Sequence, residues 1–187
     1  MDLASPVDTD KLRYQLNATL PPDVAVHAIC PVQATAHARF DALSRTYEYT
    51  IVQTKDPFLL ARSYLLSKKL AIEAMNEAVA ILYYKKDFES FSKIRAGDHH
   101  YRCTVTEAQW IPNPDGRLIF RIQANRFLRG MVRSIVSNLL QVGLGKSSVA
   151  AFETLTNQKN RSSGTSLVPP YGLTLTKVTY PAPIFSL

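Results

Sequence analysis

Three arginines recur at a spacing of three to four residues in the segment from Asn125 to Val142. They are Arg126, Arg129 and Arg133, and most residues between them are apolar. In a helix, at about 100° per residue, the three guanidinium groups would fall within about 60° of arc, opposite the apolar side chains. A guanidinium donates paired hydrogen bonds to phosphate oxygens. The pattern therefore predicts a helix that binds a polyanion, with an ordinary surface helix as the alternative.

Aromatic and basic side chains also occur together at two other places. Tyr47 lies in the alternating stretch from residue 44 to 53, and Arg39 lies in the irregular stretch HARF, residues 37–40. A tyrosine ring can stack on an unpaired base, whereas alternation alone favours Tyr47 as a core residue. Both interpretations stay open at this point. For His37 by itself a structural role is favoured.

The common catalytic motifs are missing from these residues. The sequence contains no G-x-S-x-G, no Walker loop, no G-x-G-x-x-G and no H-E-x-x-H. We expect no metal site at Asp98-His99-His100, because adjacent histidines in a strand point to opposite faces. Cys30 and Cys103 match no metal spacing, and we interpret both as reduced thiols. The residue patterns alone do not identify a reaction.

The net charge is concentrated in one segment. The chain has 22 Lys and Arg against 15 Asp and Glu, a net charge of +7. Residues 117–161 contain eight of these bases and a single acid, Glu153. The net charge of this segment, 8 − 1 = +7, therefore equals that of the whole chain. A local basic surface favours nucleic acid as partner, and a solvated face without a partner is the alternative. No apolar run approaches the roughly 20 residues of a membrane span, and residues 1–10 lack signal-peptide features. We therefore expect a cytoplasmic protein.

The hydrophobic patterns predict the elements that would position these side chains. Helices are expected at 7–20, with Asp8 as cap, at 71–84, at 125–142, with Gly143 as stop, and at 148–156, with Ser148 as cap. Strands are expected at 24–29, 44–53, 101–110, 117–123 and 173–180. The turn residues PNPDG, 112–116, join two of these strands as a hairpin. Residues 85–93 are expected to be a polar connector that contains aromatics. Interspersed helices and strands with a hairpin predict an α+β fold with a mainly antiparallel sheet packed by helices.

Five segments, taken in order, resemble the TruA-type tRNA pseudouridine synthases. They are LPPDVAV (20–26), HARFDALSRTYEYTI (37–51), KDFESFSK (86–93), ANRFLRGMVRSIVSNLLQVG (124–143) and VPPYGLTLTKVTYP (168–181). The resemblance covers nearly the whole chain and implies the pseudouridine synthase fold, an antiparallel sheet with flanking helices. It also implies that residues 1–187 are a single catalytic-type C-terminal domain of such an enzyme, with the N-terminal domain absent.

The resemblance further implies a reaction, the isomerisation of uridine to pseudouridine in the anticodon stem-loop of tRNA, at the thirty-eighth to fortieth nucleotides. It implies a homodimer, no metal and no cofactor, and a target base that leaves the stack. In the family an aspartate in a motif close to G-R-T-D-x-G-V-H starts the reaction. That motif is not among these 187 residues, and Asp2, Asp8 and Asp10 do not match it. We therefore expect a truncated chain that is inactive alone. The alternatives are a non-catalytic RNA-binding module with a basic helix face, or a structural protein.

Individual site residues also follow from the resemblance. Tyr47 resembles the tyrosine that contacts the target base, Arg133 the arginine that pairs with the catalytic aspartate, and Leu173 the apolar wall beside the base. A basic partner keeps an aspartate ionised. Without that partner, the Arg133 guanidinium is expected to face solvent or an anion. Further substrate contacts are expected from Arg39, Arg126 and Arg129.

Overall fold

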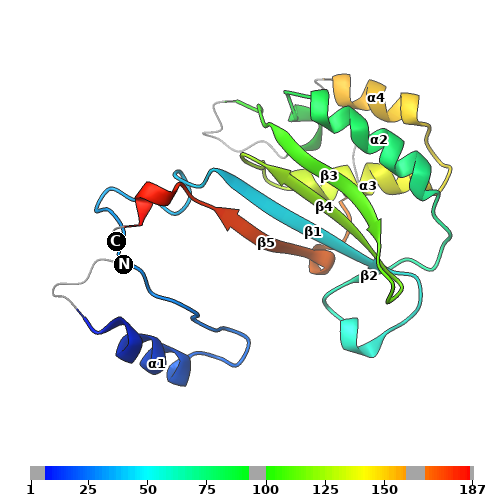
Figure 1. Ribbon diagram of the computed structural model, residues 1–187. Coiled ribbons are helices and arrows are strands. Elements are labelled where there is room, and N and C mark those ends of the chain that lie inside the picture. Colours follow the sequence, from blue (N-terminus) through cyan, green and yellow to red (C-terminus); the bar gives the residue numbers. More distant parts are fainter. Residues whose placement is uncertain (1–6, 93–99, 159–166, 186–187) are drawn as a thin grey trace. The chain divides into compact units, whose positions relative to one another are not determined.

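The computed structural model of the chain describes residues 7–92, 100–158 and 167–185 (Figure 1). The chain divides into two compact units. One, here called the terminal unit, comprises Met1–Asp41 and Tyr180–Leu187, and the other, the sheet unit, comprises Ala42–Thr179. Within the described ranges, no helix has the length and apolar character that crossing a membrane requires.

The terminal unit contains the helix α1 (Thr9–Thr19) and the short 3-10 helix η5 (Ala182–Ile184). The Asp8 carboxylate caps α1 as expected, because it accepts hydrogen bonds of 3.0 Å from two backbone N–H groups of the first turn. The strand expected at 24–29 does not form. Instead the Asn17 side-chain amide bonds both the N–H and the C=O of Val26, each at 2.8 Å. Those are the groups that a strand would offer to a neighbour.

Five strands form one sheet in the described part of the sheet unit (Figure 1). They are β1 (Ser44–Val52), β2 (Tyr64–Leu65), β3 (Val105–Pro112), β4 (Arg117–Ala124) and β5 (Leu173–Thr179). β4 lies between β1 and β3 and is antiparallel to both. The other edge of β1 pairs with β5, antiparallel, and at its end with β2, parallel. The expected α+β fold with a mainly antiparallel sheet is confirmed.

The hairpin of β3 and β4 follows from its turn residues. The Asn113 N–H donates to the Arg117 carbonyl at 2.8 Å, and the Gly116 N–H donates to the Asn113 carbonyl at 3.0 Å. Gly116 has a φ of 83°, which glycine adopts without steric cost. Alternate residues of β4 are buried, so one face of the sheet is apolar and the other is polar. The predicted hairpin is confirmed.

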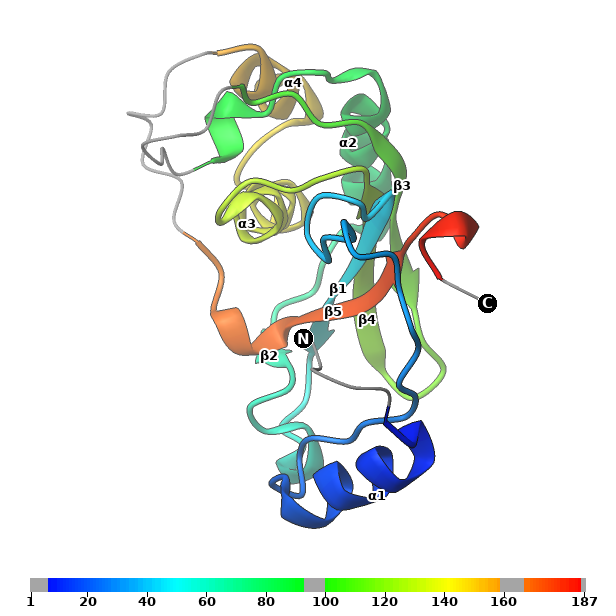
Figure 2. The same cartoon turned by 90° about the vertical axis from the view of Figure 1, so that its left-hand side faces the viewer.

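Helices α2 (Ile72–Tyr84), α3 (Met131–Gly143) and α4 (Val149–Asn157) lie together on one face of the sheet (Figures 1 and 2). The predicted cap of α4 is confirmed, since the Ser148 hydroxyl oxygen accepts from the Ala151 N–H at 3.1 Å. The expected polar connector after α2 instead contributes buried Phe88 and Phe91, around the 3-10 helix η2 (Glu89–Phe91). Fully buried side chains fill the space between helices and sheet: Tyr49, Met75, Leu82, Phe120, Ile122, Ile135, Leu139 and Phe152.

Helix α3 begins six residues later than its periodicity predicts, at Met131 instead of Asn125. Gly130 precedes it in the left-handed conformation, with φ 78° and ψ −3°, and this conformation cannot continue a right-handed helix. Arg126 and Arg129 therefore belong to the non-helical stretch before α3. The expected helical stripe of three arginines is wrong, because only Arg133 lies on the helix.

The last residue of α3, Gly143, allows α2 and α3 to pack closely. A Cβ atom at this position would overlap the Sδ and Cγ atoms of Met75, and it would lie 3.2 Å from Cδ2 of Leu70. Met75 is fully buried. The sequence indicates Gly143 only as a helix stop, whereas in the structure its missing side chain sets the contact between two helices.

Helix α2 also covers the outer edge of β3. The Asn76 side chain accepts from the Trp110 N–H at 2.9 Å and donates to the Trp110 carbonyl at 3.4 Å. About two helical turns further along the same face, the Tyr83 hydroxyl accepts from the Ala108 N–H and donates to the Ala108 carbonyl, both at 2.9 Å. These four bonds use the backbone groups that an edge strand would offer to another chain.

Candidate active site

Tyr47 and Tyr49 lie on the face of β1 that is turned towards the helices. In the pairing with β5, Tyr47 is opposite Leu175 and Tyr49 is opposite Leu173. Tyr49 is fully buried, while Tyr47 is partly exposed. Diagonal neighbours on one sheet face are about 7–8 Å apart, so Leu173 lies near Tyr47. The structure thus brings together two of the residues that the sequence singled out.

The Tyr47 ring is oriented by a second aromatic residue. It contacts Phe127, with ring centroids 5.1 Å apart and planes at 87°. Phe127 comes from the stretch between β4 and α3, and edge-to-face contacts of this kind are favourable for aromatic rings. The contact fixes the orientation of the Tyr47 ring and leaves part of the side chain accessible.

Two side chains hold the segment from Val168 to Leu173 through hydrogen bonds to two successive carbonyl groups of its backbone. The Nε of Arg133 donates to the Val168 carbonyl at 2.6 Å, and the Tyr49 hydroxyl donates to the Pro169 carbonyl at 2.9 Å. The short helix η4 (Pro170–Gly172) follows and leads directly into β5 at Leu173. Arg133 on α3 and Tyr49 on β1 thus position the segment that carries Leu173.

Gly172 brings this segment against β1. A Cβ atom at Gly172 would lie 3.0 Å from both the Thr50 carbonyl oxygen and Cζ of Tyr49. A side chain at this position would therefore push the start of β5 away from the tyrosine. The glycine lets Leu173 lie opposite Tyr49, at the edge of the face that Tyr47 shares.

The electrostatics around Arg133 favour a bound anion. Arg133 is partly buried, and no carboxylate within residues 7–92, 100–158 and 167–185 forms an ion pair with it. Its Nε donates to the Val168 carbonyl, so the two terminal nitrogens carry its remaining donor capacity.

Burial is the main cause that raises the pKa of Tyr49 above its usual range, with Tyr64 and Tyr171 adding to the increase and Arg133 opposing it. The Tyr49 hydroxyl is therefore a protonated donor at neutral pH.

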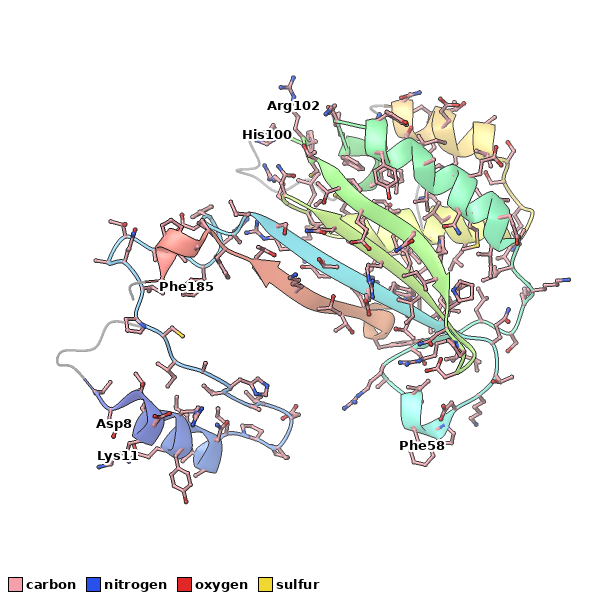
Figure 3. All side chains as sticks on the ribbon, in the orientation of Figure 1. Asp8, Lys11, Phe58, His100, Arg102 and Phe185 are labelled. Carbon is pink, nitrogen blue, oxygen red and sulfur yellow. The ribbon has the colours of Figure 1, made fainter. Side chains whose placement is uncertain are left out.

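Arg126 and Arg129 lie before α3, separate from Arg133. A terminal nitrogen of Arg126 is 3.3 Å from both ring nitrogens of His100, and Arg129 is exposed. The Arg102 N–H lies 3.2 Å from Nδ1 of His100, and Figure 3 shows the His100 and Arg102 side chains together ahead of β3. Arg126, His100 and Arg102 form a basic cluster at the end of the sheet where β3 begins and β4 ends.

Two further arginines of the basic segment are engaged in ion pairs, whereas Arg161 lies outside the described residues. On the open face of β4, Arg117 pairs with Asp115 at 2.6 Å and Arg121 pairs with Glu48 at 2.8 Å. The hydrogen bond from Arg117 is the main cause that lowers the pKa of Asp115. Within residues 117–158, the basic side chains therefore do not form one continuous basic face, because Arg117 and Arg121 are paired with Asp115 and Glu48.

Arg39 belongs to the terminal unit. Its backbone N–H donates to Nδ1 of His37 at 3.1 Å, and its guanidinium carbon lies 5.6 Å from the centroid of the Phe40 ring. This is the geometry of a cation–π contact. Its role in substrate binding remains a prediction.

Metal ligands and thiols add nothing to this site. Within the described ranges, no three His, Cys, Asp or Glu side chains gather as a metal site would need, and Asp98 and His99 lie outside those ranges. Cys103 is buried, and burial is the main cause that raises its pKa to about 11, with Asp87 adding and Arg126 opposing. The thiol is therefore protonated at neutral pH and unsuited to nucleophilic attack.

Sequence reasoning missed several residues around Tyr47. The helical periodicity places Phe127 on the apolar side of a helix, and the alternation of β1 gives Tyr49 no role beyond the buried face of its strand. A usable signal was the spacing RTYEYT, which places two tyrosines on one face. The contacts with Val168 and Pro169 had no local signal, because their partners are 35 and 120 residues away in the chain.

Comparisons with known proteins identify relatives of this chain. The family described as tRNA pseudouridine synthase matches residues 78–181. "tRNA pseudouridine synthase A" of Porphyromonas gingivalis is 42% identical over 182 residues, which cover 97% of this chain and 72% of the relative. The protein of the same name from Bacteroides fragilis is 42% identical over 180 residues, which cover 96% of this chain and 71% of the relative. The protein of the same name from Chlorobaculum tepidum is 34% identical over 177 residues, which cover 94% of this chain and 71% of the relative. The family match includes Arg133 and Leu173.

Proposed function

The chain belongs to the tRNA pseudouridine synthase family, and we propose that it binds the target uridine in the isomerisation of tRNA uridine to pseudouridine. In that reaction the bond between N1 and C1′ breaks, the uracil turns, and a bond between C5 and C1′ forms. C5 loses a proton and N1 gains one, so no redox partner is required. The base must leave the stack before the enzyme can reach it.

The observation that carries this proposal is that one segment, Val168 to Leu173, is attached to both β1 and α3. Tyr47 and Leu173 lie as diagonal neighbours on one sheet face, and Arg133 is bonded to the start of the segment. The partly exposed Tyr47 ring is suited to stack on an extruded uracil, because every base has a π-face. Leu173 supplies an apolar contact beside it.

Arg133 takes the role of partner to the catalytic aspartate. Its Nε bond to Val168 orients the guanidinium, and its terminal nitrogens can form a paired interaction with a carboxylate. Such a partner keeps the aspartate ionised. The aspartate motif of the family, close to G-R-T-D-x-G-V-H, does not occur in these 187 residues. We therefore propose that the 187-residue polypeptide alone makes no pseudouridine.

Release of tritium from tRNA that contains 5-tritiated uridine tests this proposal. The 187-residue polypeptide should release none, even when enzyme and tRNA are equimolar. A version with an N-terminal extension that carries the G-R-T-D motif should turn over repeatedly, and aspartate to alanine in that motif should abolish turnover. Multiple turnover by the 187-residue polypeptide would contradict the assignment. tRNA binding without any turnover by the extended version would favour the alternative, a non-catalytic RNA-binding module.

The basic cluster at Arg126 and the exposed position of Arg129 support a finer proposal, that both arginines bind phosphates of the anticodon stem-loop. Replacing both with glutamine should weaken tRNA binding and reduce the slope of log K against log salt by roughly one to two units. The matched control is Arg117→Gln, since Arg117 is paired with Asp115 on the open face and should not affect the slope. An isolated anticodon stem-loop should compete with whole tRNA for this binding.

Homodimer formation is proposed on the basis of β5. One edge of β5 pairs with β1, and no strand within the described ranges covers its other edge. An uncovered edge favours association. Light scattering at tens of micromolar should show a dimer, and a monomer would contradict it. We also propose a cytoplasmic location, where a tRNA substrate is available.

A further inference from the structure

The loop between β1 and β2 exposes two large apolar side chains. Phe58 is 92% exposed and Leu60 is 78% exposed, and both belong to or follow the short 3-10 helix η1 (Pro57–Leu59). Figure 3 shows the Phe58 ring at the outer tip of this loop, directed away from the sheet. Exposed apolar side chains of this size lose the free energy that burial would provide, so a partner that covered both would gain it.

Hydrogen bonds hold the loop in this conformation. The Asp56 carboxylate accepts from the Phe58 N–H at 2.9 Å. The Leu59 carbonyl accepts twice at 3.0 Å, from the Arg62 N–H and from the hydroxyl of buried Ser63. The loop therefore presents Phe58 on an ordered backbone, which reduces the entropy cost of binding through it.

Ala61 adds backbone strain at the same place. Its φ is 63°, and no other non-glycine residue in the described ranges has a positive φ. The left-handed conformation is unfavourable for an L-residue with a Cβ atom. Strained residues that a hydrogen-bonded surrounding holds in place occur preferentially at functional segments.

The charge around the loop favours an anionic partner. The exposed bases Lys55, Arg62, Lys68 and Lys69 occur within residues 53–69, against the single acid Asp56. The Asp56 carboxylate is already engaged as a cap. Two copies of the chain meeting at this loop would bring like charges together, whereas an RNA would neutralise them.

We propose that Phe58 is a stacking site for an unpaired base of the bound RNA, separate from the site at Tyr47. Lys55 and Arg62, on either side of the loop, contact the adjoining phosphates, and Leu60 packs against the base or its sugar. Stacking on an aromatic ring depends little on which base is bound. The inference rests on the proposed function, because tRNA is the RNA that such an enzyme binds.

Substitutions at Phe58 in the 187-residue chain test this site, with tRNA binding followed by fluorescence anisotropy. Phe58→Ala should weaken binding roughly 5- to 150-fold, as expected when one base no longer stacks. The salt slope should not change, because stacking releases no counterions. Phe58→Trp should retain the affinity. In contrast, Lys55→Gln with Arg62→Gln should reduce the slope by roughly 0.7 for each phosphate that is no longer neutralised.

Ultraviolet crosslinking supplies a second readout that does not depend on affinity. Irradiated complexes digested with trypsin and nuclease should yield the peptide of residues 56–62, bounded by Lys55 and Arg62, with a nucleotide attached to Phe58. Mass spectrometry identifies the modified residue. The same peptide from Phe58→Ala should lack the nucleotide.

Tyr14→Ala is the matched control, since Tyr14 is also an exposed aromatic residue, at 77%. Residues 8–23 around it contain three acids and two bases, so its replacement should not alter tRNA affinity. Unchanged affinity for Phe58→Ala, with no crosslink while the wild-type chain binds tRNA, would overturn the stacking site alone. A shift from dimer to monomer in Phe58→Ala at unchanged affinity would also overturn it and assign the loop to self-association. Failure of the wild-type chain to bind tRNA would overturn the proposed function as well.

Discussion

The Nε atom of Arg133 and the carbonyl oxygen of Val168 are joined by a hydrogen bond of 2.6 Å. This bond ties α3 to the segment that leads into β5. One residue further, the Tyr49 hydroxyl holds the Pro169 carbonyl at 2.9 Å. The orientation of the guanidinium and the position of Leu173 therefore depend on the same two peptide groups, and changes at either donor should affect both.

Arg133→Lys should separate the charge of this residue from its geometry. A lysine keeps the positive charge, but its single ammonium cannot donate to Val168 and also form a paired interaction with a carboxylate. In the version extended with the G-R-T-D motif we expect kcat to fall about 10- to 100-fold, with tRNA affinity nearly unchanged. Single-turnover tritium release and anisotropy measure the two quantities. Arg129→Lys, at an exposed position, should leave kcat unchanged, and a parallel drop in affinity in Arg133→Lys would contradict the assignment.

Tyr49→Phe and Tyr47→Phe form a matched pair on one strand face. Tyr49→Phe removes the donor to the Pro169 carbonyl and should lower the free energy of unfolding by about 1 kcal/mol. Tyr47→Phe should leave that free energy unchanged but lower the rate of the extended enzyme, with tRNA affinity nearly intact. Urea denaturation and tritium release distinguish them. Equal stability losses in both variants would show that Tyr49 does not hold the segment.

Much of the fold could be predicted because its signals are local. β1 follows from the alternation of SRTYEYTIV, the hairpin from PNPDG, and α4 from its Ser148 cap. The start of α3 could not be predicted in this way. The apolar spacing continues upstream of Gly130. Only the left-handed conformation of that glycine prevents the helix from starting earlier than Met131. Periodicity detects an apolar face, but it does not detect where the backbone leaves the helix.

The candidate site was less accessible to sequence reasoning. Tyr47, Arg133 and Leu173 stand out because the segments around them resemble a family, whereas periodicity alone favours Tyr47 as a core residue. Their relation to one another depends on Tyr49 and Pro169, which are 120 residues apart. A contact at that separation leaves no trace in a local pattern, since it results from strand pairing across the whole unit.

Gly143→Ala should destabilise the contact between α2 and α3. The added methyl group would overlap the side chain of Met75, which is fully buried and has little space to move. We expect a decrease of about 1–3 kcal/mol in the free energy of unfolding, measured in urea. Met75→Ala in the same chain should recover part of that decrease, so the two substitutions should be strongly non-additive. Gln141→Ala, at an exposed position of α3, is the control and should change little.

Ala61→Gly should stabilise the sheet unit, against the usual effect of glycine. Ala61 has a φ of 63°, and the left-handed conformation costs an L-residue about 1–2 kcal/mol that glycine does not incur. Part of this gain is offset by the greater entropy of the unfolded chain, so we expect a net gain of about 1 kcal/mol and a higher Tm. Ala150→Gly, in the first turn of α4, should have the opposite sign. A lower Tm for Ala61→Gly would show that the strain is relieved elsewhere.

Cys103 should make the stability of the sheet unit depend on pH in the alkaline range. Burial is the main cause that raises its pKa from 9.0 to about 11. Between these two values the folded chain keeps the proton that the unfolded chain loses. The free energy of unfolding should therefore be constant below about pH 9 and fall towards pH 11, by up to about 1.4 kcal/mol per pH unit.

Cys103→Ala should lower the free energy of unfolding at pH 7 through the cavity it leaves, but the variant should lack this decrease with pH. The difference between wild type and Cys103→Ala in urea denaturation should thus shrink from pH 8 to pH 11, whereas Cys30→Ala should keep the wild-type slope. Parallel curves for wild type and Cys103→Ala would show that the buried thiol does not titrate in this way.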